Sequence, residues 1–395
     1  MAVLSVNAGS STLKFSLHPV AQGQVLPSVL AGTIEGLEPG GQPRLGWTQG
    51  GHTQQLPLTV TPGDAFGAAL ARLGELLVEL PGLPRLTAVA HRVVHGGQLY
   101  SASVQVTDEV LAHLATLNSL APLHQPHNLQ GIRAFQQAFP DLPQVACFDT
   151  AFHATLSALD ASFALPRALT AQGVRRYGFH GLSYQYITGV LQASSPRAHG
   201  RVLMAHLGNG ASLCATRSGR SVSTSMGFSA LDGLMMGTRS GTLDAGVLLY
   251  LLEQGWDHDR LQTLLYKQSG LLGVSGVSAD MRRLRADGGP DAKLAVDMFT
   301  HRVVREAGAM VACLQGLDVL AFSGGIGEHD VQLRADVCER LHWLGVRMDA
   351  SANQRATGDA VRPIHAADSA VELWVVPTDE GRVAALEAVA LLNIQ

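Results

Sequence analysis

The stretch VLSVNAGSSTLKFSL, residues 3–17, joins two apolar runs through a small polar turn. From residue 12 onward apolar and polar side chains alternate, which is the period-two pattern of a strand with one buried face. Thr12 and Lys14 therefore share the polar face. The stretch predicts two paired β-strands joined by the turn NAGSS.

The turn NAGSS has two interpretations. Its backbone N–H groups, with the hydroxyls of Ser10, Ser11 and Thr12, suit a nest that binds phosphate. An ordinary hairpin turn has the same composition, however. The turn is not a P-loop, because Lys14 follows on a strand instead of opening a helix. This stretch alone leaves both interpretations open.

A second stretch, VLMAHLGNGASLCAT at residues 202–216, repeats the order of strand, glycine-bearing turn and strand. Laid over the first stretch, it aligns Asn7 with His206 and Gly9 with Gly208. Each copy falls near the start of one half of the chain. The repeat predicts a duplicated unit of strands and helices.

The rest of the chain favours two α/β domains. At 395 residues it is long for a single core. Further apolar runs end at polar or glycine-rich positions, which is how α/β folds build sites; they span 86–97, 143–153, 317–328 and 370–381. Helical spacing marks residues 64–79 and 291–314, whereas 35–55, rich in Gly, Pro and Gln, reads as a surface excursion. We expect a boundary near Thr150.

Composition narrows the class of protein. The chain is 46% hydrophobic and 15% charged with a net charge of -4, which fits a globular protein without a nucleic-acid footprint. Its four cysteines are scattered without CxxC spacing, which argues against a zinc site or disulfide framework and suits a reducing compartment. No apolar run reaches membrane-spanning length, and we expect no secretory signal, because the residues after Met1 enter a strand pattern without a basic segment and a long apolar segment. We expect a cytoplasmic protein without nucleic-acid or membrane partners.

Three glycine-rich turns follow apolar strands: NAGSS, HLGNG (206–210) and SGGIGEH (323–329). Glycine at an ordered position is unfavourable by roughly 0.5–1 kcal/mol where nothing requires it, so three such turns favour a bound nucleotide over three unrelated turns. Arg92 lies among valines and therefore needs a buried anionic partner or ligand. With Arg239, it can grip a carboxylate or a phosphoryl group.

Histidines and carboxylates complete the candidate chemistry. His124 and His180 lie in loop-like sequence, where a histidine is either structural or functional. Asp149 ends one strand run, and Asp379 and Glu380 follow another. Such carboxylates cap helices or hold Mg²⁺ in phosphoryl-transfer sites. Together these residues make an inventory typical of a kinase.

Ten motifs of the chain resemble those of acetate kinases and occur in the same order. They are NAGSSTLK, HRVVHGG, APLHQPHN, FDTAFH, YGFHGLS, HLGNGASL, TSMGF, GTRSGTLD, SGGIGEH and PTDEG. The resemblance spans residues 3 to about 381. It implies the superfamily of acetate and sugar kinases, heat-shock proteins and actin: two RNase H-like, actin-like ATPase domains with mixed sheets flanked by helices around a cleft. The domains would be 1–150, completed by a helix at about 382–395, and 151–381.

The same resemblance implies roles for individual residues. Mg²⁺, or Mn²⁺ as a substitute, would be held by Asn7 and Glu380. The catalytic residues would be Asp149, His180 and Arg239, and the acetate site would comprise Arg92, Val94, Leu123, His124, Phe179 and Ala230. Nucleotide contacts would come from Ser10, Thr12, Lys14, His206, Leu207, Gly208, Asn209, Gly210, Asp280, Met281, Arg282, Gly325, Ile326, Gly327, Glu328 and His329.

The implied reaction is direct in-line transfer of phosphoryl from ATP to acetate, giving ADP and acetyl phosphate. A small carboxylate has a pKa near that of Glu, roughly 4.3, so at pH 7 it is already the nucleophile and needs no general base. Asp149 therefore suits a role in orienting a metal or an arginine. Two alternatives stay open: a kinase that prefers propionate or butyrate, and a nucleotide-gated scaffold of the same superfamily. The family also implies a homodimer.

The chain departs from the family pattern at five positions. Thr12 replaces Ser and keeps the hydroxyl. Ala230 replaces Pro in the acyl pocket and leaves room for one more methylene, worth on the order of 1–3 kcal/mol. Tyr184 replaces His, His329 replaces Asn, and Gly381 replaces a second Glu. None of these changes alters the residues expected to be catalytic.

Overall fold

The structure is a computed structural model that describes residues 1–9, 11–38, 40–58, 65–122 and 124–395. The chain divides into two compact units, called unit 1 (Met1–Phe152 with Asp379–Gln395) and unit 2 (His153–Thr378). The sequence had placed this division at residue 150, with a helix at the C-terminus returning to the first domain. The short 3-10 helix η1 (Ala151–Thr155) carries the chain from unit 1 into unit 2.

Unit 1 is built on a mixed sheet with the strand order β6-β5-β4-β2-β1-β7-β9-β8, and β3 pairs with β2. β1 pairs antiparallel with β2 and parallel with β7, which is parallel to β9. The strands are β1 (Ala2–Ala8), β2 (Thr12–Ala21), β3 (Gln24–Val25), β4 (Leu30–Glu35), β5 (Arg44–Gln49), β6 (His52–Pro57), β7 (Leu86–Val93), β8 (Val104–Gln105) and β9 (Gln144–Phe148).

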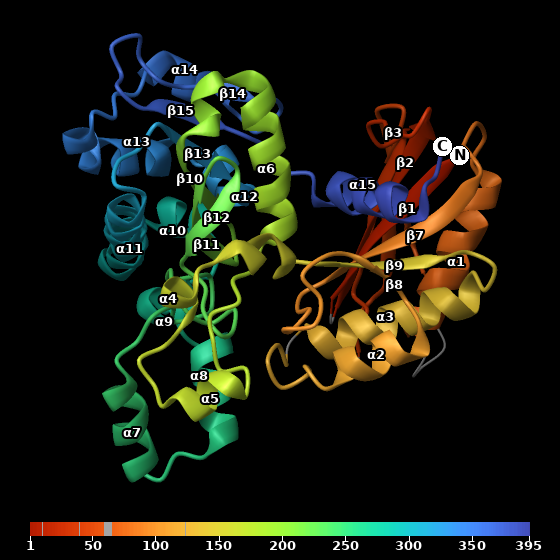
Figure 1. The fold of residues 1–395 in the computed structure, drawn as a ribbon, viewed down its shortest axis with the longest axis horizontal. Coiled ribbons are helices and arrows are strands. Elements are labelled where there is room, and N and C mark those ends of the chain that lie inside the picture. The colour runs from red at the N-terminus through yellow and green to blue at the C-terminus, as the bar shows by residue number, and fades with distance from the viewer. Residues whose placement is uncertain (10, 39, 59–64, 123) are drawn as a thin grey trace. The chain divides into compact units, whose positions relative to one another are not determined.

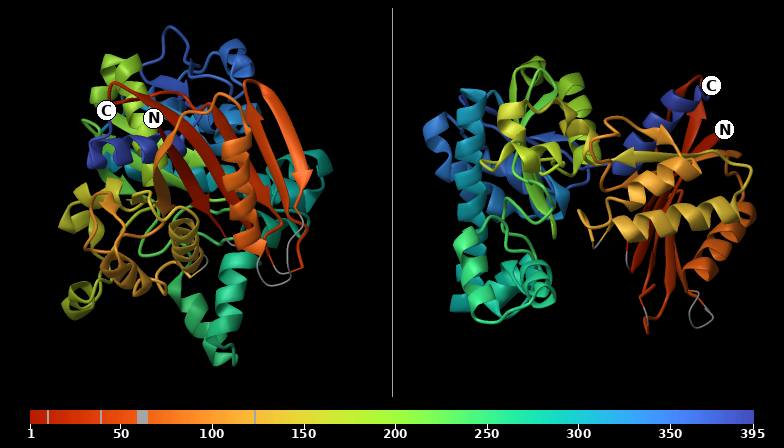
Figure 2. Two further views of the ribbon diagram at one scale, coloured as in Figure 1. Left: turned by 90° about the vertical axis from the view of Figure 1, so that its right-hand side faces the viewer. Right: turned by 60° about the horizontal axis from the view of Figure 1, so that its bottom comes forward.

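Helices cover both faces of this sheet (Figures 1 and 2). They are α1 (Ala65–Glu79), α2 (Asp108–Ala115), α3 (Gln125–Ala138) and α15 (Glu380–Leu392). Leu4, Val6 and Phe15 join leucines of α1 and Phe135 of α3 in one buried core. The opposite face meets α15, where Ser5 Oγ donates to the Gly381 carbonyl. The alternation read from residues 12–17 therefore decides which side chains face α15.

Unit 2 repeats the plan with the order β12-β11-β10-β13-β15-β14. β10 pairs antiparallel with β11 and parallel with β13, which is parallel to β15. The strands are β10 (Arg201–Leu207), β11 (Ala211–Arg217), β12 (Arg220–Thr224), β13 (Val319–Ser323), β14 (Arg362–Pro363) and β15 (Glu372–Val375). β1 and β10 each pair antiparallel with the next strand of their own unit and parallel with a later strand. The duplication predicted from the two sequence stretches is therefore confirmed.

The helices of unit 2 are α4 (Ala158–Ala161), α5 (Arg167–Ala171), α6 (Gly181–Ser194), α7 (Ala245–Glu253), α8 (His258–Lys267), α9 (Gly270–Ser275), α10 (Met281–Asp287), α11 (Pro290–Leu314), α12 (Gly324–His329), α13 (Val331–Arg340) and α14 (Ala350–Arg355), with 3-10 helices η2 (Pro196–His199) and η3 (His342–Leu344). α6 packs on β10, and α11 packs on β11 and β12. α11 begins at Pro290, whose missing N–H is one that the first turn does not use. Its C-cap residue, Gln315, has the left-handed conformation.

Two expectations from the sequence are wrong. Residues 35–55 are not a surface excursion, since β5 and β6 extend the sheet from β4. The outer strand β6 is largely exposed, so it carries no apolar pattern. SGGIGEH is also not a turn: Gly324, with a φ of 74°, is the first residue of α12. Its backbone N–H groups are therefore those of a helix's first turn.

Candidate functional site

A guanidinium gripped by two carboxylates forms the polar centre of unit 1. Arg92 donates from Nε to Asp149 Oδ1 at 3.1 Å and from Nη2 to Asp149 Oδ2 at 2.6 Å. Glu380 Oε2 lies 3.2 Å from the same Nε. The Asp149 side chain is only 1% exposed, while those of Arg92 and Glu380 are 18% and 21% exposed. The anionic partner that the sequence required for Arg92 is thus confirmed.

The electrostatics of this cluster follow from its charge count. Burial by itself would lower the pKa of the Arg92 guanidinium, but the charges of Asp149 and Glu380 outweigh burial and raise that pKa. Two carboxylates around one guanidinium leave one excess negative charge. A further cation is therefore favoured before another anion can approach.

The sheet brings these three residues together from distant parts of the chain. His91 on β7 packs against Phe135, so its neighbour Arg92 points to the opposite face, toward α15. Asp149 directly follows β9, and its N–H donates to the Val93 carbonyl of β7. Glu380 is the first residue of α15, which packs on this same face.

Asn7, Thr12 and Lys14 share that face of the sheet. Leu4, Val6, Leu13 and Phe15 belong to the core on the other side, so the residues between them point toward the α15 side. Asn7 and Lys14 are cross-strand partners in the β1–β2 ladder. Ser10, expected beside them, lies outside the described residues.

The expected acetate site of unit 1 is only partly described. Val94 is 5% exposed, and its N–H donates to Asn128 Oδ1 at 3.1 Å. His124 precedes α3 as its N-cap residue, and Leu123 lies outside the described residues. Asn128 Nδ2 also donates to the Ala8 carbonyl at the end of β1. Sequence reasoning missed this role of Asn128, although APLHQPHN contains it.

In unit 2, His180 lies in a network of side-chain hydrogen bonds. It precedes α6 with a φ of 58°. Its Nδ1 lies 2.8 Å from Ser212 Oγ, which lies 2.5 Å from the Tyr184 hydroxyl. The His180 ring stacks on His206 with centroids 4.3 Å apart, and His206 Nδ1 lies 2.8 Å from Ser183 Oγ. Neither serine was expected in the site.

Two of the expected residues lie beside Gly210 in the turn that follows β10. A Cβ on Gly210 would lie 3.4 Å from His180 Nε2 and 3.6 Å from Arg239 Nη2. Arg239 Nη1 donates to the Ala230 carbonyl at 2.8 Å. Phe179 is buried, next to His180 in the chain. The structure thus brings His180, Arg239, Ala230 and the HLGNG turn together.

The glycine-rich segments of unit 2 also converge. β10 and β13 are parallel neighbours, with His206 opposite Ser323. Gly324 packs so closely on Leu207 that a Cβ would lie 2.7 Å from the Leu207 carbonyl oxygen. The ends of both strands, and with them Leu207–Gly210 and Gly325–Gly327, therefore lie side by side. Convergent backbone N–H groups of this kind suit phosphate oxygens.

Glu328 and His329 make contacts that the sequence did not predict. Glu328 Oε1 accepts from the backbone N–H of Gly324 at 2.8 Å and of Thr378 at 3.2 Å. His329 Nδ1 lies 2.6 Å from the Thr357 carbonyl. Both side chains therefore hold protein segments together around α12.

Asp280, Met281 and Arg282 form the start of α10. Asp280 caps the helix and accepts from the Arg282 backbone N–H and guanidinium. Those bonds lower the pKa of Asp280 to about 2. Met281 is buried, whereas the Arg282 side chain is 90% exposed. The ion pair of Arg282 is therefore with Asp280, at the start of its own helix.

The donor set can be tested against Mg²⁺. Within the described residues, no group of three or more His, Cys, Asp or Glu side chains is placed to hold a metal. Mg²⁺ needs fewer protein ligands, because it keeps several waters and uses one or two carboxylates with substrate phosphates. Asp149 and Glu380, which both contact Arg92, and Asn7 on the same face fit this requirement.

Across the described residues, no helix has the length and apolar character needed to span a membrane.

Two α/β units with the same central strand pairings, each carrying polar groups at strand ends, define the class of actin-like ATPases. The chain matches the Acetokinase family over residues 2–386. It therefore belongs to that family.

Individual relatives agree with this assignment. An acetate kinase of Rhodopseudomonas palustris (strain ATCC BAA-98 / CGA009) is 49% identical over 383 residues, covering 96% of this chain and 95% of that protein. A propionate kinase from Francisella tularensis subsp. tularensis SCHU S4 superposes with a TM-score of 0.88 at 36% identity, covering 98% of both chains. The Porphyromonas gingivalis acetate kinase gives 0.86 at 35% identity, covering 99% of both.

Proposed function

We propose that this protein transfers the γ-phosphoryl group of ATP reversibly to acetate, giving ADP and acetyl phosphate. The family match over nearly the whole chain carries the proposal. One arginine in each unit supports phosphoryl transfer to a carboxylate. Arg92 lies between two carboxylates, and Arg239 lies beside His180 and the HLGNG turn.

The geometry supports a mechanism of positioning and charge. Acetate is ionised at neutral pH, so no residue needs to remove a proton from it. Arg92, oriented bidentately by Asp149, is suited to grip the carboxylate, while Arg239 and His180 are suited to the equatorial oxygens of the transferring group. When bound, Mg²⁺ would neutralise phosphate charge, with Asp149, Glu380 and Asn7 as the residues that hold it.

An acyl hydroxamate assay with ATP, Mg²⁺ and acetate tests the activity. We expect hydroxamate that depends on all three components. Direct transfer predicts inversion of configuration at a chiral γ-phosphorus, whereas retention would indicate a phosphoenzyme and refute the mechanism. Absence of any acyl phosphate would refute the function.

Propionate is a second candidate substrate. Ala230, in place of the Pro of the family pattern, supports it, and so does the solved propionate kinase among the structural relatives. The Arg239 guanidinium bonds to the backbone carbonyl of Ala230, which a proline would retain. We expect Ala230→Pro to lower kcat/KM for propionate relative to acetate by about tenfold, which corresponds to the lost space for one methylene. An unchanged ratio would contradict this role of Ala230.

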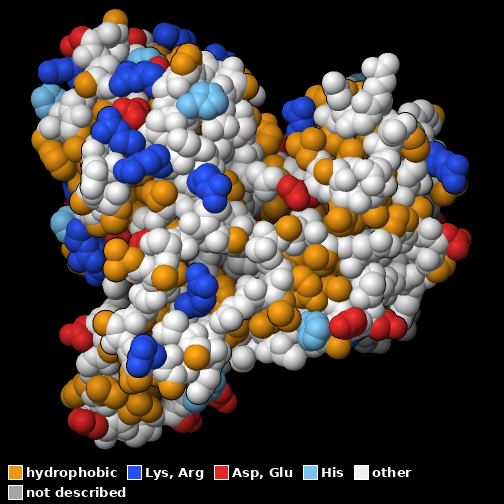
Figure 3. Space-filling model, viewed as in Figure 1, with side chains coloured by type: hydrophobic (Ala, Val, Ile, Leu, Met, Phe, Trp, Pro, Cys, Tyr) orange, Lys and Arg blue, Asp and Glu red, His pale blue; other side chains and the backbone are white. Residues whose placement is uncertain are grey.

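We also propose a homodimer formed through α7. Every residue of α7 remains at least partly exposed, although the helix is strongly apolar. Leu249, Tyr250 and Leu252 are 49–62% exposed, and hydrophobic side chains gather over α7 in Figure 3. An apolar helix of this kind favours burial against another surface. Light scattering should give twice the chain mass, and Leu249→Asp should give monomers.

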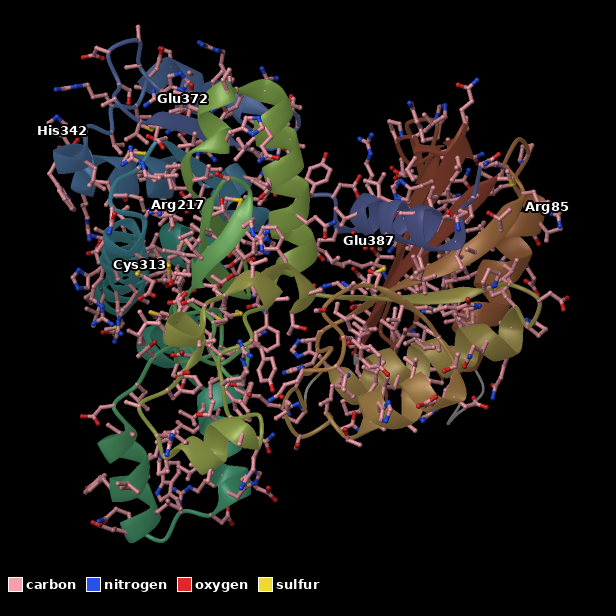
Figure 4. The ribbon with its side chains drawn as sticks, viewed as in Figure 1. Arg85, Arg217, Cys313, His342, Glu372 and Glu387 are labelled. Atoms are coloured by element: carbon pink, nitrogen blue, oxygen red, sulfur yellow. The ribbon has the colours of Figure 1, made fainter. Side chains whose placement is uncertain are left out.

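A cytoplasmic location completes the proposal. All four cysteines are free, which suits a reducing compartment. Cys313 projects from α11 and is exposed (Figure 4), while Cys147, Cys214 and Cys338 are buried. Fractionation of cells that express a tagged chain would test this location.

A further inference from the structure

Tyr184 is the buried end of the hydrogen-bond network on His180. Its side chain is fully buried, although it carries a hydroxyl, and it lies one helical turn after His180 at the start of α6. The Tyr184 backbone N–H donates to the His180 carbonyl at 3.0 Å. From β11, Ser212 Oγ bridges the two side chains, at 2.5 Å from the phenol and 2.8 Å from His180 Nδ1.

The acidity of the groups sets the direction of these bonds. Burial raises the pKa of Tyr184, but a phenol is a far stronger acid than an aliphatic alcohol and is the better donor of the two. Tyr184 therefore donates to Ser212 Oγ, and the Ser212 proton goes to His180 Nδ1. An imidazole that accepts at Nδ1 carries its proton at Nε2.

The Nε2 atom of His180 faces the space beside the HLGNG turn. A Cβ on Gly210 would be in van der Waals contact with both His180 Nε2 and Arg239 Nη2. An Nε2–H donor there would lie close to the Arg239 guanidinium. Preorganised donors of this kind stabilise charge that develops during phosphoryl transfer.

We propose that Tyr184 is a positioning residue for His180: through Ser212 it keeps Nδ1 an acceptor and presents Nε2–H to the transferring phosphoryl group. This inference rests on the proposed function. The family pattern has His at this position, so the device belongs to this chain's own sequence.

Steady-state kinetics of Tyr184→Phe test the proposal, because this variant removes only the hydroxyl. We expect kcat to fall about tenfold, as for the loss of one oriented hydrogen bond, with KM for ATP unchanged. Ser212→Ala breaks the same connection and should give the same fall. Wild-type kcat in both variants would overturn the proposal.

A double-mutant cycle separates positioning from a role in packing. If Tyr184 acts through His180, Tyr184→Phe will change the residual kcat of His180→Ala by less than about twofold, since the ring to be positioned is gone. An undiminished tenfold fall in that background would assign Tyr184 a structural role and overturn the proposal. Tyr177→Phe is the matched control: it also loses a buried hydroxyl bond, to the Gly173 carbonyl at 2.8 Å, and should retain kcat.

Histidine-ring ¹⁵N NMR gives a readout that does not depend on turnover. The His180 signals are assigned by their loss in His180→Ala. We expect a protonated Nε2 and an unprotonated Nδ1 in the wild type, and a shifted Nδ1 signal in Tyr184→Phe. A protonated Nδ1 in the wild type would overturn the inference. An inactive wild-type protein with the expected tautomer would refute the proposed function and leave the network supported.

Discussion

Asp149→Asn changes one charge in the most buried ion pair of the proposed site. Asp149 accepts two hydrogen bonds from Arg92, and its side chain is 1% exposed. Asparagine keeps the shape but only one acceptor oxygen, so one charge-assisted bond is lost. Such bonds contribute roughly 1.5–3 kcal/mol each. Since Glu380 remains beside Arg92 at 3.2 Å, the guanidinium keeps one partner. We expect the free energy of unfolding to fall by about 2–3 kcal/mol, below the 3–5 kcal/mol typical of an orphaned buried charge.

The effect on catalysis should be larger than the effect on stability suggests. Without its bidentate partner, Arg92 can shift toward Glu380, and a displacement of about 1 Å at a reacting group lowers the rate by about 10²-fold. We therefore expect kcat/KM for acetate to fall about 10²-fold in the hydroxamate assay. Urea unfolding followed by circular dichroism measures stability on the same samples.

Asp318→Asn is the matched control for Asp149→Asn. Asp318 also pairs bidentately with an arginine, since Arg201 donates from Nη2 at 2.6 Å and from Nε at 3.0 Å. This pair is more exposed, and neither residue belongs to the proposed site. We expect a smaller loss of stability and wild-type kcat/KM. The reasoning is refuted if Asp149→Asn retains full activity, or if the two variants lose activity equally.

Three further predictions concern the site and its surroundings. Arg239→Ala should lower kcat by about 10²–10³-fold with the fold intact by circular dichroism, and normal turnover would contradict the assigned site. Gly210→Ala places a methyl group 3.4 Å from His180 Nε2, in the space proposed for the transferring phosphoryl group, and should therefore lower kcat/KM. Gly308→Ala on α11 is the control: a Cβ there meets nothing within 4 Å, so kcat/KM should not change. Burial lowers the pKa of His91 to about 4. Because the unfolded chain at low pH binds a proton at His91 that the folded protein does not bind, this residue alone should lower the free energy of unfolding by about 3 kcal/mol from pH 6.5 to 4. His91→Gln should remove that part of the pH dependence in urea titrations.

Local patterns predicted much of the fold. The alternation in residues 12–17 assigned Lys14 to the polar face because side-chain direction in a strand depends only on position parity. The likeness of residues 3–17 and 202–216 predicted two units of one plan, and the strand pairings confirm it. Prediction failed at β6, because an exposed edge strand needs no apolar face and its partner β5 is identified only by pairing.

The candidate site shows the same division. The apolar neighbours of Arg92 required an anionic partner but did not identify it among the candidates Asp149, Asp379 and Glu380. The structure shows that Asp149 and Glu380 both contact the guanidinium. The sequence did not show that the Glu328 carboxylate accepts backbone N–H groups of the protein, and its contact with a nucleotide stays a prediction. The residue types were readable from the sequence, but their partners were not.

By itself, the sequence determined which residues carry charge, which face of each strand they occupy and where the chain repeats itself, because these properties depend on neighbours a few positions away. Only the tertiary structure decided that Ser212 joins Tyr184 to His180, and that Asp149 and Glu380 meet at Arg92. Those contacts depend on strand order and helix packing. They bring together residues whose separation along the chain leaves no trace in local pattern.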